Sequence, residues 1–148
     1  MLSKYLAPRS ERAYALLRIA FGLLFSFHGA QKIFGSFVED PSSLPAFPSQ
    51  IWFGGMIELV GGLAIASGLF ATCAAFLASG TMAVAYVQFH WMSKAGDVAT
   101  LQFGKGFFPG INGGEMALLY SFAFLYMACK GSGVWSLDSL RSRKSPPG

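Results

Sequence analysis

The sequence has few charged residues and lacks the motifs of common cofactor sites. Only 12% of its 148 residues are charged, 53% are hydrophobic, and the mean hydropathy is +0.49. A soluble domain of this size needs more charged surface, so we predict an integral membrane protein. No GxGxxG or CxxCH motif is present. The sequence therefore gives no indication of flavin, haem or dinucleotide binding.

The two cysteines, Cys73 and Cys129, are far apart and belong to no CxxC motif. This spacing fits neither a zinc site nor a thioredoxin-type site. The topology inferred below places both cysteines near cytoplasmic helix ends, where a reducing environment disfavours disulfides. We therefore expect both to be small, buried packing residues.

The basic residues are concentrated at the two ends of the chain, and the net charge is +4. This distribution indicates membrane orientation and no nucleic-acid partner. By the positive-inside rule both termini are expected in the cytoplasm, which requires an even number of membrane spans. No A-x-A cleavage pattern follows the first apolar run. We therefore expect a retained first helix, not a signal peptide.

Four apolar stretches predict an all-α fold, a four-transmembrane-helix antiparallel bundle. The expected helices cover about 14–34, 51–70, 73–91 and 113–129, within a membrane domain of 14–130. Residues 1–13 are expected to form a basic N-terminal segment, and residues 131–148 a polar tail. Pro41, Pro45 and Pro48 predict a loop after the first helix. A second long loop is expected over residues 92–111.

Ionisable side chains from all four helices fall near one end of the bundle: His28, Lys32, Glu58, His90 and Glu115. The other half of the bundle is almost purely apolar, apart from Arg18, which is expected to anchor the first helix. Polar groups in hydrocarbon are costly and usually functional. This segregation predicts a polar pocket that opens to the outer face beneath the two long loops.

Glu58 is the strongest candidate for a functional residue. Residues at four-residue spacing share its face of the second helix: Gly54, Glu58, Gly62 and Ala66. Because small residues allow helices to approach closely, this face is expected to point into the bundle. A carboxylate at this depth must be protonated or paired with a base, and His28 and Lys32 are the available bases.

We interpret His28 and Glu58 as catalytic candidates that exchange protons. The predicted ligand-binding residues are Gln31, Lys32, Tyr86, His90, Asn112 and Glu115. Simpler readings exist for several of them. Lys32 could extend to the membrane interface, His90 could belong to an aromatic belt with Trp91, and Asn112 with Glu115 fits a helix capping box. His28 could also be a neutral partner of Glu58.

Two histidines and two glutamates could in principle bind a metal. The Glu-x-x-His spacing of di-iron bundles is absent, however. We therefore predict no metal site.

Several motifs, in this order along the chain, resemble the DoxX family: Arg18-x3-Gly22, His28-Gly29-x-Gln31-Lys32-x-Phe34-Gly35, Glu58-x2-Gly61-Gly62, Phe107-Phe108-Pro109, Asn112-Gly113-Gly114-Glu115 and Gly131-x-Gly133-x-Trp135-Ser136-Leu137-Asp138. The resemblance covers about Tyr14 to Leu140. It implies a bacterial inner-membrane protein of four helices. Relatives include the membrane subunit of a thiosulfate:quinone oxidoreductase and proteins linked to quinone or oxidative-stress resistance.

Three functions fit these observations. The first is binding of a quinone or small redox solute in the pocket, in support of proton-coupled oxidoreduction. The second is a non-catalytic scaffold or accessory subunit of a larger membrane complex, or a homo-oligomer, with the small-residue faces serving partner helices. The third is transport of a small anion or a proton, which the apolar inner half of the bundle disfavours. We favour the first.

Overall fold

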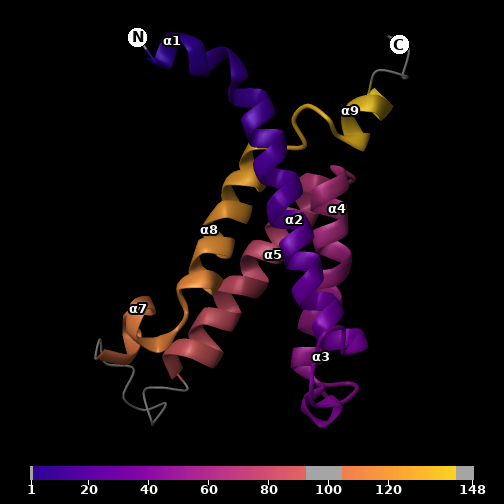
Figure 1. The fold of residues 1–148 in the computed structure, drawn as a ribbon, viewed down its shortest axis with the longest axis vertical. Coiled ribbons are helices and arrows are strands. Elements are labelled where there is room, and N and C mark those ends of the chain that lie inside the picture. The colour runs from indigo at the N-terminus through magenta and orange to yellow at the C-terminus, as the bar shows by residue number, and fades with distance from the viewer. Residues whose placement is uncertain (1, 93–104, 143–148) are drawn as a thin grey trace.

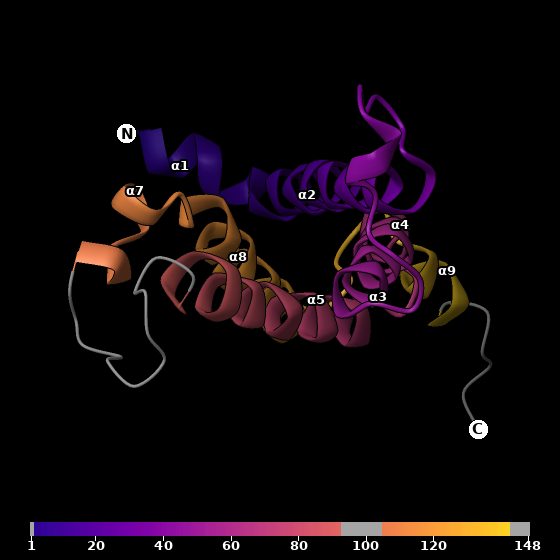
Figure 2. The same ribbon diagram turned by 90° about the horizontal axis from the view of Figure 1, so that it is seen from below.

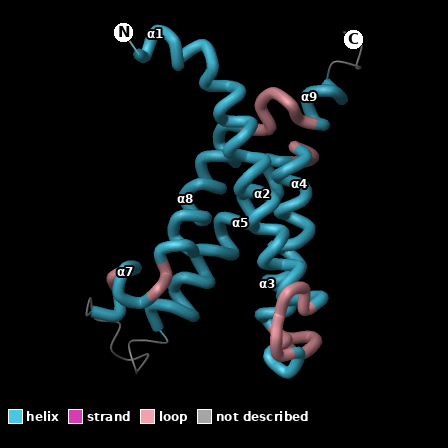
Figure 3. The backbone as a smooth tube through the Cα atoms, in the orientation of Figure 1, coloured by secondary structure: helices cyan, strands magenta, loops and turns pink. Residues whose placement is uncertain are grey.

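The computed structural model describes residues 2–92 and 105–142, and within these ranges it contains helices and no strand. The prediction of an all-helical fold is thus confirmed. Loops are confined to the two ends of the helices (Figure 3). Those parts of the predicted second loop and polar tail that cover residues 93–104 and 143–148 lie outside the described residues.

Three helical stretches are long and apolar enough to cross a membrane: Leu2–Phe34, Gln50–Ser67 and Ala71–Met92. The first comprises α1 (Leu2–Leu6), the 3₁₀ turn η1 (Ala7–Arg9) and α2 (Ser10–Phe34). The second comprises α3 (Gln50–Met56), the π-helix η3 (Ile57–Gly61) and α4 (Gly62–Ser67), and the third α5 (Ala71–Ala85) and the π-helix η4 (Tyr86–Met92). The chain is therefore a multi-pass protein of the lipid bilayer.

The remaining elements are shorter. The 3₁₀ turns η2 (Pro41–Ser43) and η6 (Lys105–Phe107) lie in the connecting segments, and α7 (Pro109–Asn112) precedes α8 (Glu115–Lys130). The chain then forms α9 (Leu137–Ser142). At 16 residues, α8 is shorter than the three stretches above. Its role as a fourth span therefore stays a prediction.

The helices form two arms that separate toward one end of the molecule (Figure 1). One arm is α5 packed along α8, and the other is α3, η3 and α4 packed against α2. Seen from below, α8 and α3 lie on opposite sides, with α2 and α5 between them (Figure 2). Both α1 and α9 lie at the end where the arms meet.

Buried side chains hold the arms together where they converge. Phe25 of α2 and Phe124 of α8 are 1% and 0% exposed, and their ring centroids lie 4.8 Å apart. Within the arm formed by α5 and α8, the Ser79 hydroxyl donates to the Ser121 carbonyl at 2.8 Å, and the Ser121 hydroxyl donates to the Ser79 carbonyl at 3.1 Å. Reciprocal bonds of this kind satisfy both hydroxyls without water, as hydrocarbon surroundings require.

Glycines let α2 lie directly against the second membrane-crossing stretch. A Cβ atom on Gly22 would lie 2.7 Å from the Gly62 carbonyl oxygen, and one on Gly62 would lie 2.6 Å from the Gly22 carbonyl oxygen. The predicted small-residue face is therefore right for Gly62. The prediction is wrong for Gly54, because no atom of a neighbouring helix lies within 4 Å of its Cβ position. The adjacent Gly55 packs against α2 instead.

We expect Gly29→Ala to lower the free energy of unfolding by about 1–3 kcal/mol, because overpacking a tight contact forces the backbone to shift. Its Cβ would lie 2.2 Å from the Leu59 backbone nitrogen. The measurement is detergent-dependent unfolding followed by circular dichroism. Gly80→Ala is the matched control, since nothing lies within 4 Å of the Gly80 Cβ position. Equal stability of the two variants would contradict this packing.

The cysteines are not where the sequence analysis expects them. Cys73 and Cys129 are both exposed on the helix surface, so the prediction of buried packing residues is wrong. The residues that pack between α5 and α8 are instead small or aromatic neighbours such as Ala75, Ala78 and Tyr120.

Arg18, which the sequence analysis expects to anchor the first helix, is completely buried. Its guanidinium donates to the carbonyl oxygens of Ile65 and Ala66, at 2.7 and 3.0 Å, at the end of α4. It also donates to the carbonyls of Val134 and Trp135, at 3.5 and 2.7 Å. A cation at a helix C-terminus satisfies carbonyls that have no intrahelical partner. Arg18 therefore joins α2, α4 and the segment before α9.

The Asp138 carboxylate caps the start of α5, accepting from the backbone N–H groups of Phe70 and Ala71 at 3.1 and 3.3 Å. The Ser132 hydroxyl donates to it at 2.6 Å. The bond from Ser132, followed by the two backbone bonds, holds the pKa of Asp138 below its usual value. A carboxylate at a helix N-terminus is also favoured by the helix dipole.

This depressed pKa predicts a pH dependence. The bonds from Asp138 to the start of α5 contribute their full stability at pH values above the pKa of an unfolded aspartate, about 3.9. That contribution is lost as pH falls through the lower folded pKa. We expect hydrogen exchange at the Phe70 and Ala71 amides to accelerate below about pH 4, relative to neighbouring α5 amides. Asp138→Asn should exchange faster at neutral pH and lose this pH dependence, and an unchanged profile in that variant would contradict the capping role.

Candidate functional site

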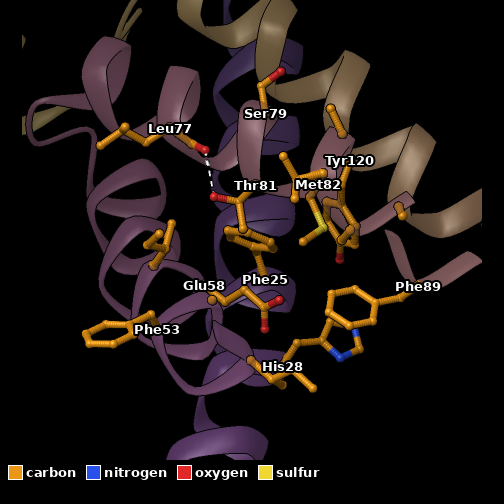
Figure 4. A pocket seen from close by; sticks show the side chains of 18 of the residues that line it. Phe25, His28, Phe53, Glu58, Leu77, Ser79, Thr81, Met82, Phe89 and Tyr120 are labelled. Carbon is orange, nitrogen blue, oxygen red and sulfur yellow. Dashed lines mark hydrogen bonds between the residues drawn. The ribbon is translucent and has the colours of Figure 1, made fainter. Parts of the chain in front are cut away.

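A cavity of 840 Å³ opens between the two arms where they separate. Its walls come from α2, from α3 and η3, from α5 and η4, and from α8. The lining is mainly aromatic and aliphatic, and it also includes charged and imidazole side chains. The residues that matter below are Phe25, His28, Lys32, Phe53, Glu58, Gly80, Phe89, His90 and Tyr120. Figure 4 shows several of them from close by.

Glu58 and Lys32 form an ion pair in the cavity wall. The Lys32 Nζ lies 2.5 Å from the Glu58 Oε1, and the two side chains are 37% and 3% exposed, respectively. Glu58 therefore points into the bundle, as predicted, and Lys32 is the base that pairs with it. The second carboxylate oxygen, Oε2, is buried and has no hydrogen-bond partner among the described residues. A buried charge that is only partly satisfied is costly, and such a group is a candidate ligand contact.

Glu58 lies in the π-helix η3, and a second π-helix, η4, carries His90 on another wall of the cavity. Short π-helical segments inside α-helices often occur at functional sites, because the extra residue changes the direction of the side chains. Nothing in the residue types of these segments distinguishes them from ordinary α-helix. This local feature is therefore one that the sequence analysis does not predict.

Both histidines line the cavity. The His28 ring makes an edge contact with the Tyr120 ring, with centroids 6.4 Å apart and an interplanar angle of 86°. The Nδ1 atom of His90 lies 3.3 Å from the Asn112 carbonyl oxygen, which ties η4 to α7. In Figure 4 the His28 imidazole and the Glu58 carboxylate both extend into the cavity. Glu58 bonds to Lys32, and His28 is exposed, so the alternative of a buried His28–Glu58 pair is not what the structure shows.

Tyr86 and Asn112 are not among the residues that line the cavity. The Tyr86 hydroxyl donates to the Phe107 carbonyl, and the Asn112 side-chain amide donates to the Gly106 carbonyl at 2.8 Å. Both side chains are about 5% exposed. Their observed contacts therefore hold the segment from η6 to α7 against η4.

The predicted capping box is wrong. The Asn112 Oδ1 accepts from the Gly114 backbone N–H at 2.7 Å, and α8 begins at Glu115 without a side-chain cap. Gly113 adopts a left-handed conformation, with φ of 77°, which lets the chain turn between α7 and α8. Glu115 is exposed, and neither it nor Gln31 lines the cavity.

A polar contact that the sequence analysis misses bridges the two arms at the cavity. The Gln50 side-chain amide at the start of α3 donates to the Gln88 side-chain oxygen in η4, at 2.6 Å. Gln50 also lines the cavity. Only the fold brings these two residues together, because they are 38 positions apart in the chain.

Metal-binding side chains do not gather at this site. In the described ranges no three or more histidine, cysteine, aspartate or glutamate residues are grouped to hold a metal ion. The donor set of the cavity is one ion pair with separate imidazoles, which suits an organic ligand better than a metal.

Membrane-crossing helices that surround a partly polar cavity define a multi-pass membrane protein. Residues 13–91 match the model of the DoxX family. An uncharacterized protein of Haemophilus influenzae is 38% identical over 130 residues, which cover 84% of this chain and 87% of that protein. The chain therefore belongs to the DoxX family. No solved structure matches the chain.

Proposed function

We propose that this DoxX protein binds a quinone or a small redox solute in the cavity and supports proton-coupled oxidoreduction. The observation that carries the proposal is the Lys32–Glu58 ion pair, buried on the Glu58 side, in the wall of a cavity that is otherwise mostly apolar. Reduction of a quinone takes up protons together with electrons. A site for this reaction needs proton-exchanging side chains beside apolar walls that accept the ring and tail.

In this proposal Glu58 and His28 exchange protons with the ligand and with outer water. Lys32 and His90 contact the head group, and the aromatic walls formed by Phe25, Phe53 and Phe89 accept the ring and the tail. Gln31, Tyr86, Asn112 and Glu115 then act at the rim, where Tyr86 and Asn112 shape the entrance through their bonds to the segment above.

The proposal includes a membrane topology. We place the protein in the bacterial inner membrane, with α8 as a fourth span and both termini in the cytoplasm. The packing of α8 along α5 and the position of α1 and α9 at one end support this arrangement. The basic residues near that end, such as Lys4, Arg12 and Arg141, support the cytoplasmic assignment by the positive-inside rule. The cavity then opens toward the periplasm.

Filling the cavity should abolish ligand binding. Gly80 lines the cavity and no neighbouring atom lies within 4 Å of its Cβ position, so the side chain of Gly80→Phe begins in open space at the cavity wall. We expect saturable binding of short-chain ubiquinone and menaquinone to the protein in nanodiscs, measured by equilibrium dialysis. This binding should disappear in Gly80→Phe.

The matched control is Leu119→Phe, which adds an aromatic ring on the exposed face of α8. This variant should bind as the parent protein does. If neither quinone binds saturably to the parent protein, or if Gly80→Phe binds as well as Leu119→Phe, the cavity is not a quinone site.

A further inference from the structure

The unpartnered oxygen of Glu58 restricts which ligand the cavity can hold. Glu58 is 2% exposed, its Oε2 has no hydrogen-bond partner among the described residues, and its carboxylate extends into the cavity (Figure 4). A carboxylate oxygen only accepts hydrogen bonds. An oxidised quinone offers only carbonyl oxygens, which are acceptors as well. A quinone carbonyl placed at Oε2 would therefore leave both oxygens unsatisfied.

Lys32 disfavours a positively charged ligand group at the same position. Its ammonium group carries three N–H donors, and one of them is used by the Glu58 Oε1. A cationic ligand group beside Glu58 would thus lie next to a second positive charge. A hydroxyl satisfies both neighbours, because it donates to the Glu58 Oε2 and accepts from the Lys32 Nζ. A quinone carbonyl cannot make both of these bonds, whereas a ring hydroxyl can.

We infer that the cavity prefers a ring that carries a hydroxyl group on an apolar tail, and so prefers a hydroquinone to the corresponding quinone. This inference rests on the proposed function and specifies which redox form of the ligand binds more tightly. The exposed aromatic side chains of the cavity wall, Phe53 and Phe89, supply surfaces against which such a ring can pack. The inference concerns binding alone.

The test compares two pairs of ligands on the parent protein in nanodiscs. The first pair is ubiquinol-1 and ubiquinone-1, under reducing and oxidising conditions. The second pair is 4-dodecylphenol and 4-dodecylanisole, which share ring and tail and have no quinone chemistry. A hydrogen bond to a charged group stabilises enough to predict roughly tenfold or more tighter binding of the hydroxyl member of each pair.

The variant Glu58→Gln tests whether Glu58 causes the preference for hydroxyl ligands. A glutamine amide both donates and accepts, so the preference should fall to about equal binding in this variant. Its folding is checked by size-exclusion chromatography. If the variant does not fold, the two ligand pairs on the parent protein still decide the question.

Each outcome has one meaning. Tighter binding of both hydroxyl ligands, lost in a folded Glu58→Gln variant, supports the inference. Equal binding within both pairs overturns it while leaving a quinone site in place, since a water molecule can then satisfy Oε2 as well as a ligand does. Retention of the preference in folded Glu58→Gln removes Glu58 as its cause. No binding of any of the four ligands removes the proposed function itself.

Discussion

Replacing Arg18 with methionine is expected to lower the free energy of unfolding by at least about 3 kcal/mol, because its buried hydrogen-bond partners then have no other donor. Arg18 donates to four backbone carbonyls from two distant segments. The Ile65 carbonyl also accepts from the Gly68 N–H at 3.1 Å, so three carbonyls lose their donor, those of Ala66, Val134 and Trp135. Each carbonyl left without a donor costs about 1–3 kcal/mol, and methionine fills the volume without donating. Loss of helicity during detergent-induced unfolding of the purified protein measures the effect.

Two further variants sharpen this test. Arg18→Lys retains the charge but not the planar fork, so we expect an intermediate loss of stability. Arg12→Met removes an exposed arginine from the same helix and should change stability by less than about 0.5 kcal/mol. An Arg18→Met protein as stable as Arg12→Met would show that the arginine does not hold the inner end of the fold together.

Replacing Lys32 with methionine is expected to destabilise the protein by about 3–5 kcal/mol, which is more than Glu58→Gln does. The two ends of the ion pair are not equivalent, because the lysine side chain is 37% exposed and the glutamate side chain 3%. Losing the lysine leaves an unpaired charge in a buried position, whereas losing the carboxylate leaves a lysine that reaches water. Thermal unfolding in nanodiscs, followed by circular dichroism, shows which of the two variants loses more stability.

The double variant Lys32→Met with Glu58→Leu tests the origin of this loss. Replacing a buried ion pair by apolar residues of similar size is often nearly neutral. We therefore expect the double variant to recover most of the stability that Lys32→Met loses. Additive losses in the double variant would mean that the two side chains do not act as a pair.

The broad class of the fold follows from the sequence because long apolar runs with few charges have few structural solutions. The inward position of Glu58 also follows, because small residues at helical spacing mark a helix contact. That Lys32 and not His28 pairs with it depends on side-chain reach between two packed helices. Spacing along one helix does not contain that information.

The role of Arg18 is harder to predict because its partners are backbone carbonyls. They lie at Ile65, Ala66, Val134 and Trp135, and no side-chain type marks them. The available signal is an arginine within an apolar run together with the glycine-rich segment before Asp138. The capping box fails for a related reason, since Asn112 bonds to the Gly114 amide in a turn that precedes the helix.

Photo-crosslinking tests most directly whether ionisable residues of separate helices share one ligand cavity. An azido-quinone is irradiated with the protein in nanodiscs, and the adducts are mapped by mass spectrometry with and without excess unlabelled quinone. We predict displaceable adducts in the segments of α2 and η3 that contain His28 and Glu58. Adducts confined to outward-facing positions such as Leu119 and Phe122, unaffected by competitor, would contradict a ligand site between the arms.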